Sequence, residues 1–582
     1  MAFGAVSEQA RVWRLLAHSA WQSGLRWLHG GPMFRWQPFS PTPSRLLIAP
    51  QDLRTADSTN AADIYAGRFL FAGYLVETGG RSPFEVEPPS DDWSRALHGF
   101  GWLRHMRAAN TNVARQNARA LVDDWIKSCG RWHPVGWEEP VVARRILSWL
   151  SQSPLILEGC DRDFYRRFLR SIARQVRYLR KTINETHDGV PRLTVAIAIA
   201  AATVCMAGQN RFVRQSLRRL DQELARQILA DGGHISRNPA ALVEILVDLL
   251  PVRQALSMQG LPAPQNVMTA IDRMMPMIRF FRHGDGAFAH FNGCGSTAAD
   301  ILATILAYDD ARGAAPVNAP HSGYQRLTGG DTVVLIETGK PPPISVSDRA
   351  HAGCLSIEIS SRRNRLIINC GVSGISRGRW SAVARSSAAH STAIIEDTSS
   401  ARFLSGRYSG RWLGAPIISG PTNVPVAREE SEAGTRVAAS HNGYQERFRI
   451  VHERDITLSG DGTVIDGIDR FKPTSTLGNE DAYAVRFHLH PQVKASLTRA
   501  GTAVLLVCPD GEAWEFVAPH AEMAIEESIY LSDVYSHRRT EQIVLFGRAK
   551  TEPETRWQLR RTATPKTVRK RVGESAAPEL DL

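Results

Sequence analysis

The hydrophobic pattern of this chain changes its period once, and this change divides it into two parts. Over residues 57–308 apolar side chains recur at spacings of three and four, as at Leu242, Ile245 and Leu249, which predicts amphipathic helices. Residues 311–322, rich in Ala, Pro and Gly, form the connection between the parts. Beyond them, short segments alternate apolar and polar residues between Gly, Asn and Asp turns, which predicts antiparallel strands.

A chain of 582 residues is too long for a single hydrophobic core. We predict an N-terminal extension over 1–56, a helical domain over 57–310, a β domain over 323–550 and a disordered basic tail over 551–582. The first predicted helix spans residues 61–76. Helices of similar length with short loops predict successive antiparallel hairpins, which form either a bundle or an incomplete α/α toroid. The helical pattern does not distinguish these two arrangements.

The formal net charge of +12 predicts a surface that attracts anions. Nucleic acid, an anionic membrane face and acidic polysaccharide all fit that charge, and so does a solvated basic surface without a partner. No Cys/His finger spacing, basic zipper or aromatic RNA-binding motif is present, so we do not expect a nucleic-acid partner. The seven cysteines are scattered, which favours buried free thiols over disulfides or a thiolate metal site.

The sequence predicts no transmembrane segment, because the longest apolar run, from Leu193 to Gly208, is shorter than the ~20 residues that a membrane-spanning helix needs. This run is typical of a buried helix. Charged residues, among them Glu8 and Arg11, interrupt the first 31 residues, so we expect no cleaved signal peptide. That favours a cytoplasmic protein, whereas a polymeric substrate would favour the periplasm or cell envelope. The oligomeric state is left open.

Three polar side chains flank two predicted strands in the β domain. His351 precedes a segment in which Leu355, Ile357 and Ile359 alternate with polar residues, so one face should meet a core and the other water. Asn369 ends the next strand, and His390 follows a loop. We therefore expect these three polar groups to converge.

These segments, HAGCLSIEIS, RLIINCG and RSSAAHST, closely resemble the C-terminal domain of heparinase II/III-type polysaccharide lyases. The family pattern reads His-Ala-Asp, then Asp-x-Gly, then Arg-x-Thr-x-x-His-Asn, in the same order and spacing. The resemblance continues weakly over about residues 132–548. It implies a multidomain α and β fold, with an N-terminal incomplete (α/α) toroid, a C-terminal antiparallel β-sandwich and a cleft for an acidic, uronate-containing glycan between them.

Family members cleave such glycans by β-elimination, which needs donors to neutralise the uronate carboxylate, a base for the C5 proton and an acid for the leaving oxygen. This sequence differs from the family at the corresponding positions. Asn184 and His187 are a looser version of an Asn-His pair, Ala241 stands in place of a tyrosine, and Arg349 stands in place of a histidine.

Replacement candidates occur nearby, and the resemblance implies their roles. His187 is the candidate base, and Tyr324 or His234 the candidate acid. Arg237 or Asn238 is the candidate carboxylate clamp. The further candidate substrate-binding residues are His290, Arg349 and Arg385. The alternative for His234 is a packed or capped loop, and for Tyr324 a core position with a satisfied hydroxyl.

Family members that bind zinc in the β domain use His, Asp and His, so the resemblance implies His351, Asn369 and His390 as zinc ligands. The alternative is a hydrogen-bonded turn that holds the strands in register. The predicted function is β-elimination of an acidic glycan, with a catalytically impaired glycan-binding protein of envelope or exopolysaccharide metabolism as the alternative. Hydrolysis would need two acids flanking the bond, and no carboxylate pair stands out.

Overall fold

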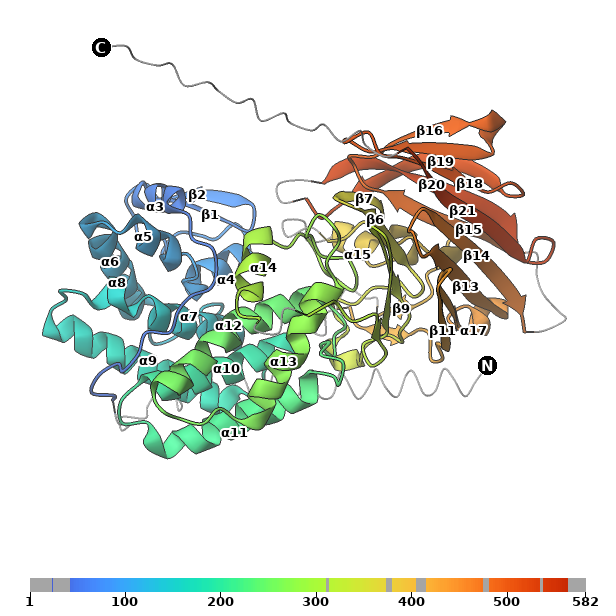
Figure 1. The fold of residues 1–582 in the computed structure, drawn as a ribbon. Coiled ribbons are helices and arrows are strands. Elements are labelled where there is room, and N and C mark those ends of the chain that lie inside the picture. Colours follow the sequence, from blue (N-terminus) through green and yellow to red (C-terminus); the bar gives the residue numbers. More distant parts are fainter. Residues whose placement is uncertain are drawn as a thin grey trace, which may run out of the picture.

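A helical half and a β half lie next to each other in the computed structural model of the protein, the helices in blue and green and the sheets in yellow to red (Figure 1). The structure describes residue 24 and residues 42–309, 313–372, 379–404, 415–474, 481–533 and 537–563. Most of the predicted N-terminal extension, and the predicted tail beyond residue 563, therefore lie outside the described residues.

The described helices of the first half follow one another from residue 58 to residue 306. They are α3 Ser58–Tyr65, α4 Asp91–Gly99, α5 Leu103–Ala109, α6 Asn112–Ser128, α7 Glu139–Ser151, α8 Ser153–Leu157, α9 Arg162–Thr182, α10 Val190–Cys205, α11 Asn210–Gln227, α12 Pro239–Met258, α13 Gln265–Phe280 and α14 Ala299–Leu306. Polar side chains cap several of them; Ser90 accepts from the Trp93 amide and Asp161 from the Phe164 amide, which satisfies amides that have no partner within the helix.

Helix α10 is the centre of this half. It packs against α7, α9, α11 and α12, and its residues from Val195 to Cys205 are all buried. A helix that is apolar on every side has to be surrounded by other helices. The sequence-based prediction of a buried helix at this position is therefore confirmed.

The predicted helix over residues 61–76 is wrong in its second half. Helix α3 ends at Tyr65, and the following residues form a hairpin of β1 Arg68–Phe71 and β2 Tyr74–Glu77. Ala72 and Gly73 both have positive φ, 48° and 80°, as a two-residue hairpin turn with the twist of its strands requires. Tertiary contacts of Phe69 and Phe71 with Trp102 and Trp93 hold the hairpin in place.

Two large antiparallel sheets make up most of the described β half, beside a small sheet of β9 Arg402–Phe403 and β10 Ile417–Ser419. In the described residues one sheet has the order β11 Val426–Ser431, β12 Gly434–His441, β13 Ile450–Ser459, β14 Val464–Pro473, β21 Glu554–Ala563, β18 Ala513–Val517, β17 Ala503–Val507 and β16 Lys494–Thr498. The other has the order β19 Glu522–Tyr530, β20 Arg538–Arg548, β15 Ala482–Leu489, β7 Asn364–Ile368, β6 Ile357–Ser361, β5 Thr332–Glu337, β4 Tyr324–Gly329 and β3 Asn318–Ala319, with β8 Ala393–Ile395 paired to β15. Their apolar faces meet in one core.

The predicted start of the disordered tail at residue 551 is wrong. Strand β21 lies between β14 and β18 in the middle of a sheet, with Trp557 and Leu559 buried in the core. Arg556 and Arg560 alternate with these apolar residues and project from the opposite face of the strand. Arg561 instead lies over the Trp514 ring and pairs with the buried Glu512.

The expected water-facing side of the β6 segment is also wrong. Ser356, Glu358 and Ser360 are fully or almost fully buried. Ile357 and Ile359 do point into the sandwich core, but the opposite face of this sheet is covered by the helical half. A buried polar face of this kind requires hydrogen-bond partners, and those partners form the site described below.

All seven cysteines are free thiols, as predicted, and all are buried except the half-buried Cys160. Among the helices that the structure describes, none combines the length and the apolar character that crossing a membrane requires.

Candidate functional site at the domain junction

The face of the sheet that meets the helices carries ionisable side chains. Tyr324 on β4 lies opposite Glu337 on β5, and Leu335 on β5 lies opposite Glu358 on β6. Because side chains alternate between the faces of a strand, Tyr324, Glu337 and Glu358 all point toward the helical half.

Arg237 is the main contact from the helical half. It precedes α12 with a positive φ of 60° and is 7% exposed. Its Nε donates to the Ser322 carbonyl at 2.7 Å, and its Nη atoms donate to the carbonyls of Gly323, Gly339 and Lys340 at 2.6–3.2 Å. Nη1 also lies 3.0 Å from Oε1 of Glu337. The guanidinium N–H groups that would bind a substrate carboxylate therefore already have protein acceptors.

The Tyr324 hydroxyl is equally occupied. It donates to the Arg237 carbonyl at 2.6 Å and accepts from the Asn292 amide at 2.8 Å. Asn292 also donates to Oε1 of Glu337 at 2.8 Å. Burial raises the pKa of Tyr324 far above its ordinary value. The hydroxyl therefore has the satisfied core position that was the alternative to a catalytic acid.

Glu337 was not predicted as a site residue. It is 1% exposed, and its Oε2 has no hydrogen-bond partner in the described structure. Burial raises the pKa of Glu337, and the charge of Arg237 offsets this only in part. The sequence signal for Glu337 is an acidic residue at the end of the otherwise apolar strand Thr332–Glu337.

His351 and His390 come together as expected. Nδ1 of His351 and Nε2 of His390 are 2.9 Å apart, and Nδ1 of His390 is 2.7 Å from the Ser386 carbonyl. Because a carbonyl only accepts, the His390 proton sits on Nδ1, and its Nε2 accepts from His351. Burial, followed by the charges of His390 and Arg385, lowers the pKa of His351 well below its ordinary value.

The third expected zinc ligand faces other partners. The Asn369 amide nitrogen donates to Oε1 of Glu358 at 3.1 Å, and its oxygen accepts from the Ser391 amide at 2.9 Å. Nε2 of His283 lies 2.9 Å from Oε2 of the same Glu358. His351 and His390 are therefore hydrogen-bonded to each other, and both the nitrogen and the oxygen of the Asn369 amide have protein partners. Zinc favours a free carboxylate or thiolate beside its imidazoles, so this donor set does not fit a zinc ion.

His234, Asn238 and Arg385 also make structural contacts. His234 is 1% exposed, lies 3.0 Å from Oε1 of Gln227 through Nε2, and accepts from the Ser236 amide; burial lowers its pKa to about 4. Asn238 caps α12 through the Ala240 amide. Arg385 is buried and donates to backbone carbonyls of the loop that precedes His351.

The remaining predicted residues differ in exposure. His290 is 2% exposed, and burial lowers its pKa to about 4. Arg349 and His187 are exposed. Asp188, next to His187, accepts from the Ser345 hydroxyl of the β half at 3.1 Å. A Cβ added at Gly293 would lie 2.7 Å from the Arg349 carbonyl and 3.5 Å from the Asn238 amide nitrogen, so these two residues are neighbours. Arg349, His187 and the half-buried Asn238 form the accessible edge of the junction.

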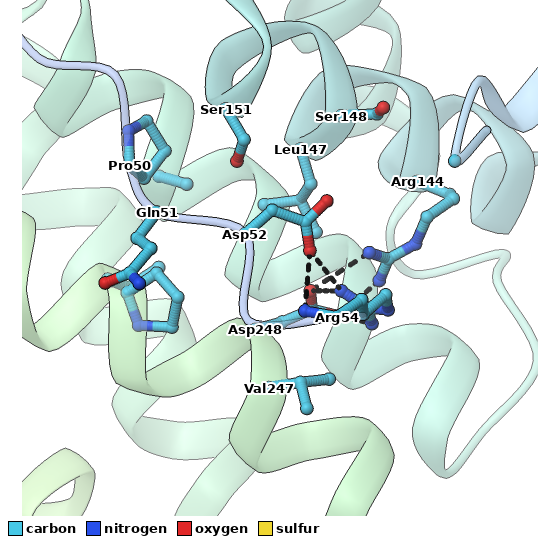
Figure 2. Close-up of a pocket in the computed structure, with 14 residues that line it drawn as sticks. Pro50, Gln51, Asp52, Arg54, Arg144, Leu147, Ser148, Ser151, Val247 and Asp248 are labelled. Atoms are coloured by element: carbon cyan, nitrogen blue, oxygen red, sulfur yellow. Dashed lines mark hydrogen bonds and ion pairs between the residues drawn. The ribbon is translucent and has the colours of Figure 1, made fainter. Parts of the chain in front are cut away.

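The two cavities described in this structure lie elsewhere, both in the helical half. One is a small space of about 20 Å³ beside Asp248, which is held by Arg54 and Arg144 (Figure 2). The other, of about 510 Å³, lies between α10, α11 and the loop after α12. None of the predicted site residues lines either cavity.

Comparison with known proteins gives the arrangement a family context. A family model described as "Heparinase II/III-like, C-terminal" matches residues 311–558. FtsZ-localized protein C of Caulobacter vibrioides (strain NA1000 / CB15N) is 31% identical over 575 residues, which cover 96% of this chain and 98% of that protein.

Several solved structures resemble most of this chain, among them the following two. Heparinase III has a TM-score of 0.69 at 14% identity over 93% of this chain and 90% of that one. A mutant of heparan sulfate lyase HepC from Pedobacter heparinus has a TM-score of 0.62 at 16% identity over 96% of this chain and 91% of that one. At these identities the likeness concerns the fold.

The fold expected from the sequence is therefore confirmed as an incomplete α/α toroid, rather than a bundle, followed by an antiparallel β-sandwich. The matched C-terminal domain and the full-length relative together show that this chain, a polysaccharide lyase-like protein, belongs to the heparinase II/III family.

Proposed function

We propose that this protein keeps the heparinase II/III fold without its elimination chemistry, and that it binds an anionic glycan at the accessible edge of the domain junction. The proposal is supported by the burial of candidate catalytic and substrate-binding side chains at the junction. Arg237, Tyr324 and His234 are each at least nine-tenths buried and bonded to protein groups. A general acid or a carboxylate clamp has to contact its substrate.

The accessible edge supports binding of an anion. Arg349 is exposed there, in the position where the family resemblance implies a histidine. Asn238 and His187 add hydrogen-bonding groups from the toroid side. The net charge of +12 favours an anionic partner over a neutral glycan.

The relative named FtsZ-localized protein C supports a place of action as well as a fold. Its sequence aligns with almost the whole of this chain, so the two proteins share both domains. We extend the proposal to localisation with FtsZ in cells that contain it.

Elimination and binding are separated by the absorbance of the product. Elimination leaves an unsaturated uronate that absorbs ultraviolet light, whereas binding leaves the glycan unchanged. We expect no absorbance increase with heparan sulfate, chondroitin sulfate or alginate, together with retention of the protein on at least one of these glycans immobilised on a resin.

Matched variants identify the surface that binds. Arg349→Glu should abolish retention, whereas Arg363→Glu, a change of the same charge at an exposed position on the β6–β7 turn, should leave it unchanged. An absorbance increase that is lost in His187→Ala would contradict the proposal and assign β-elimination with His187 as base. Equal loss of retention in both arginine variants would show non-specific charge binding.

Localisation is tested with a fluorescent fusion. Expressed in Caulobacter vibrioides in place of FtsZ-localized protein C, the fusion should coincide with labelled FtsZ. A uniform distribution at equal expression would contradict this part of the proposal and leave the glycan assay unaffected.

A further inference from the structure

A row of arginines crosses the outer surface of the toroid without carboxylate partners. Its members lie on α9, at its flanks and at the start of α11. They are Arg131, Arg170, Arg174, Arg177, Arg180 and Arg211. None of the six forms an ion pair within the described part of the chain, although Arg167 on the same helix pairs with Asp123 at 3.0 Å. Arg170, Arg174 and Arg177 share one helix face because they are four and three residues apart.

The arginines of the row repel one another. The pKa of Arg174 is lowered by burial and by the charges of Arg131 and Arg170. Burial and the charge of Arg174 lower that of Arg177. Like charges this close destabilise the folded state, and a bound anion removes that cost.

The row leads to the larger of the two cavities. Burial, Arg211 and Arg177 lower the pKa of Arg180 to about 10. Its guanidinium lies 4.0 Å from the centre of the Phe212 ring, and Arg211 lies 4.6 Å from the same ring. Nη2 of Arg180 donates to Oγ1 of Thr203 at 2.8 Å, and Thr203 lines the cavity.

This cavity is mainly apolar and has an arginine in its wall. It measures about 510 Å³. Its lining includes Val213, Arg214, Leu217, Leu261 and Pro262. Arg214 and its neighbour Arg211 are exposed. An apolar concavity bordered by cations is suited to an apolar side chain whose flanking residues are acidic.

The N-terminal segment of this chain is a poor occupant on charge grounds. Residues 1–41 contain Arg11, Arg14, Arg26 and Arg35 but a single acidic residue, Glu8. Segment and arginine row would repel each other. Nucleic acid and a lipid surface fit the row but do not require a concave apolar cavity next to it.

We propose that the arginine row and the adjoining apolar cavity form a docking surface for an acidic segment of a partner protein, with an apolar side chain of that segment seated between α11 and the loop after α12. This surface is separate from the domain junction, and it does not depend on glycan binding there.

The test uses the full-length protein and a fluorescein-labelled synthetic peptide in which glutamates flank a pair of leucines. Anisotropy should show saturable binding that weakens as salt is raised. Arg211→Glu/Arg214→Glu should weaken it by about tenfold or more. Arg363→Glu/Arg539→Glu, which changes the net charge equally at exposed positions of the β-sandwich, should leave binding within about twofold of the unchanged protein.

Two further measurements test the cavity and the choice of occupant. Replacing the leucines of the peptide by alanine, or filling the cavity with Val213→Trp, should also weaken binding, with circular dichroism confirming that the variant is folded. Equal binding of the alanine peptide would overturn the role of the cavity. Tighter binding of single-stranded DNA, of vesicles of anionic lipid or of a synthetic peptide of residues 1–41, lost in the same arginine variant, would overturn the choice of an acidic protein segment. So would an absence of saturable peptide binding at low salt.

Discussion

At the scale of single residues, burial decides which ionisable groups are available for chemistry. Arg237 and Tyr324 are the residue types that elimination uses, yet both are enclosed by backbone carbonyls and by Asn292. A buried donor without a partner costs about 1–3 kcal/mol, so the fold satisfies these groups internally. An internally satisfied group has no free hydrogen bond to offer a substrate.

Asn369 shows why an amide rather than a carboxylate stands at this position. Burial would raise the pKa of its neighbour Glu358, but the hydrogen bond from His283 and the charge of His290 lower it to about 2. Asn369→Asp would place a second carboxylate against this one. We expect a loss of about 3–5 kcal/mol in the free energy of unfolding by urea. Asn318→Asp, at an exposed position on β3 where the side-chain oxygen accepts from the Gln325 amide at 2.8 Å, is the control and should cost about 1 kcal/mol or less.

The same geometry predicts the response to zinc. Neither zinc nor a chelator should shift the melting temperature of the unchanged protein, because His351 and His390 are bonded to each other. A rise with zinc that the chelator reverses would show that the imidazole pair opens for a metal.

His234 predicts how stability depends on pH. Its folded pKa of about 4 lies below the ~6.5 of an unfolded histidine. The unfolded chain therefore binds a proton that the folded chain excludes, and stability falls as the pH drops from about 6.5 toward 4. From pH 7 to pH 5 this group alone should remove about 2 kcal/mol. His234→Gln should reduce the pH-dependent loss in urea unfolding by about that amount, and an unchanged pH dependence would contradict the assignment.

At the scale of elements, one buried carboxylate ties three segments of the toroid together. Asp248 on α12 is 6% exposed and binds Arg54 of the extended N-terminal segment and Arg144 of α7 (Figure 2). Burial would raise the pKa of Asp248, but the two guanidinium groups lower it far below its ordinary value. The extended segment around Arg54 is held to the helices by the ion pair between Arg54 and Asp248 and by hydrogen bonds such as that from Arg104 to the Thr55 carbonyl.

Asp248→Ala should cost about 3–5 kcal/mol, because it leaves two partly buried arginines without their carboxylate. Trypsin should then cleave after Arg54 faster than in the unchanged protein. Asp63→Ala is the control, since its pair with Arg68 is 43–46% exposed and should contribute less than about 1 kcal/mol. Equal effects of the two substitutions would contradict the role of Asp248.

At the scale of the whole molecule, the two domains share an interface that is polar and buried. Arg237 reaches from the toroid to carbonyls of the β half, and Arg326 reaches back from β4 to the carbonyls of Phe280 and Arg282. Tyr324 and Leu335 of the β half belong to the toroid's apolar core. We therefore expect the domains to unfold together.

Arg237→Met should separate the two domains thermodynamically, because it leaves Glu337 and several carbonyls without a partner at the interface. Calorimetry should then show two transitions in place of one. Arg454→Met is the control, since this buried arginine contacts Asp469 and carbonyls within the β half. It should lower the melting temperature without splitting the transition, and splitting in both variants would contradict the assignment to Arg237.

Local patterns in the sequence determined the two domains, most helix positions, the buried α10 and the approach of His351 to His390, because hydrophobic period and strand spacing are properties of neighbouring residues. Only the tertiary structure decided that residues 68–77 form a hairpin and that β21 completes a sheet. It also decided that Glu358 faces the toroid rather than water, and that Arg237 and Tyr324 are bonded to protein groups. The burial of a polar group depends on segments far away in the chain, and no local pattern records which of them will cover it.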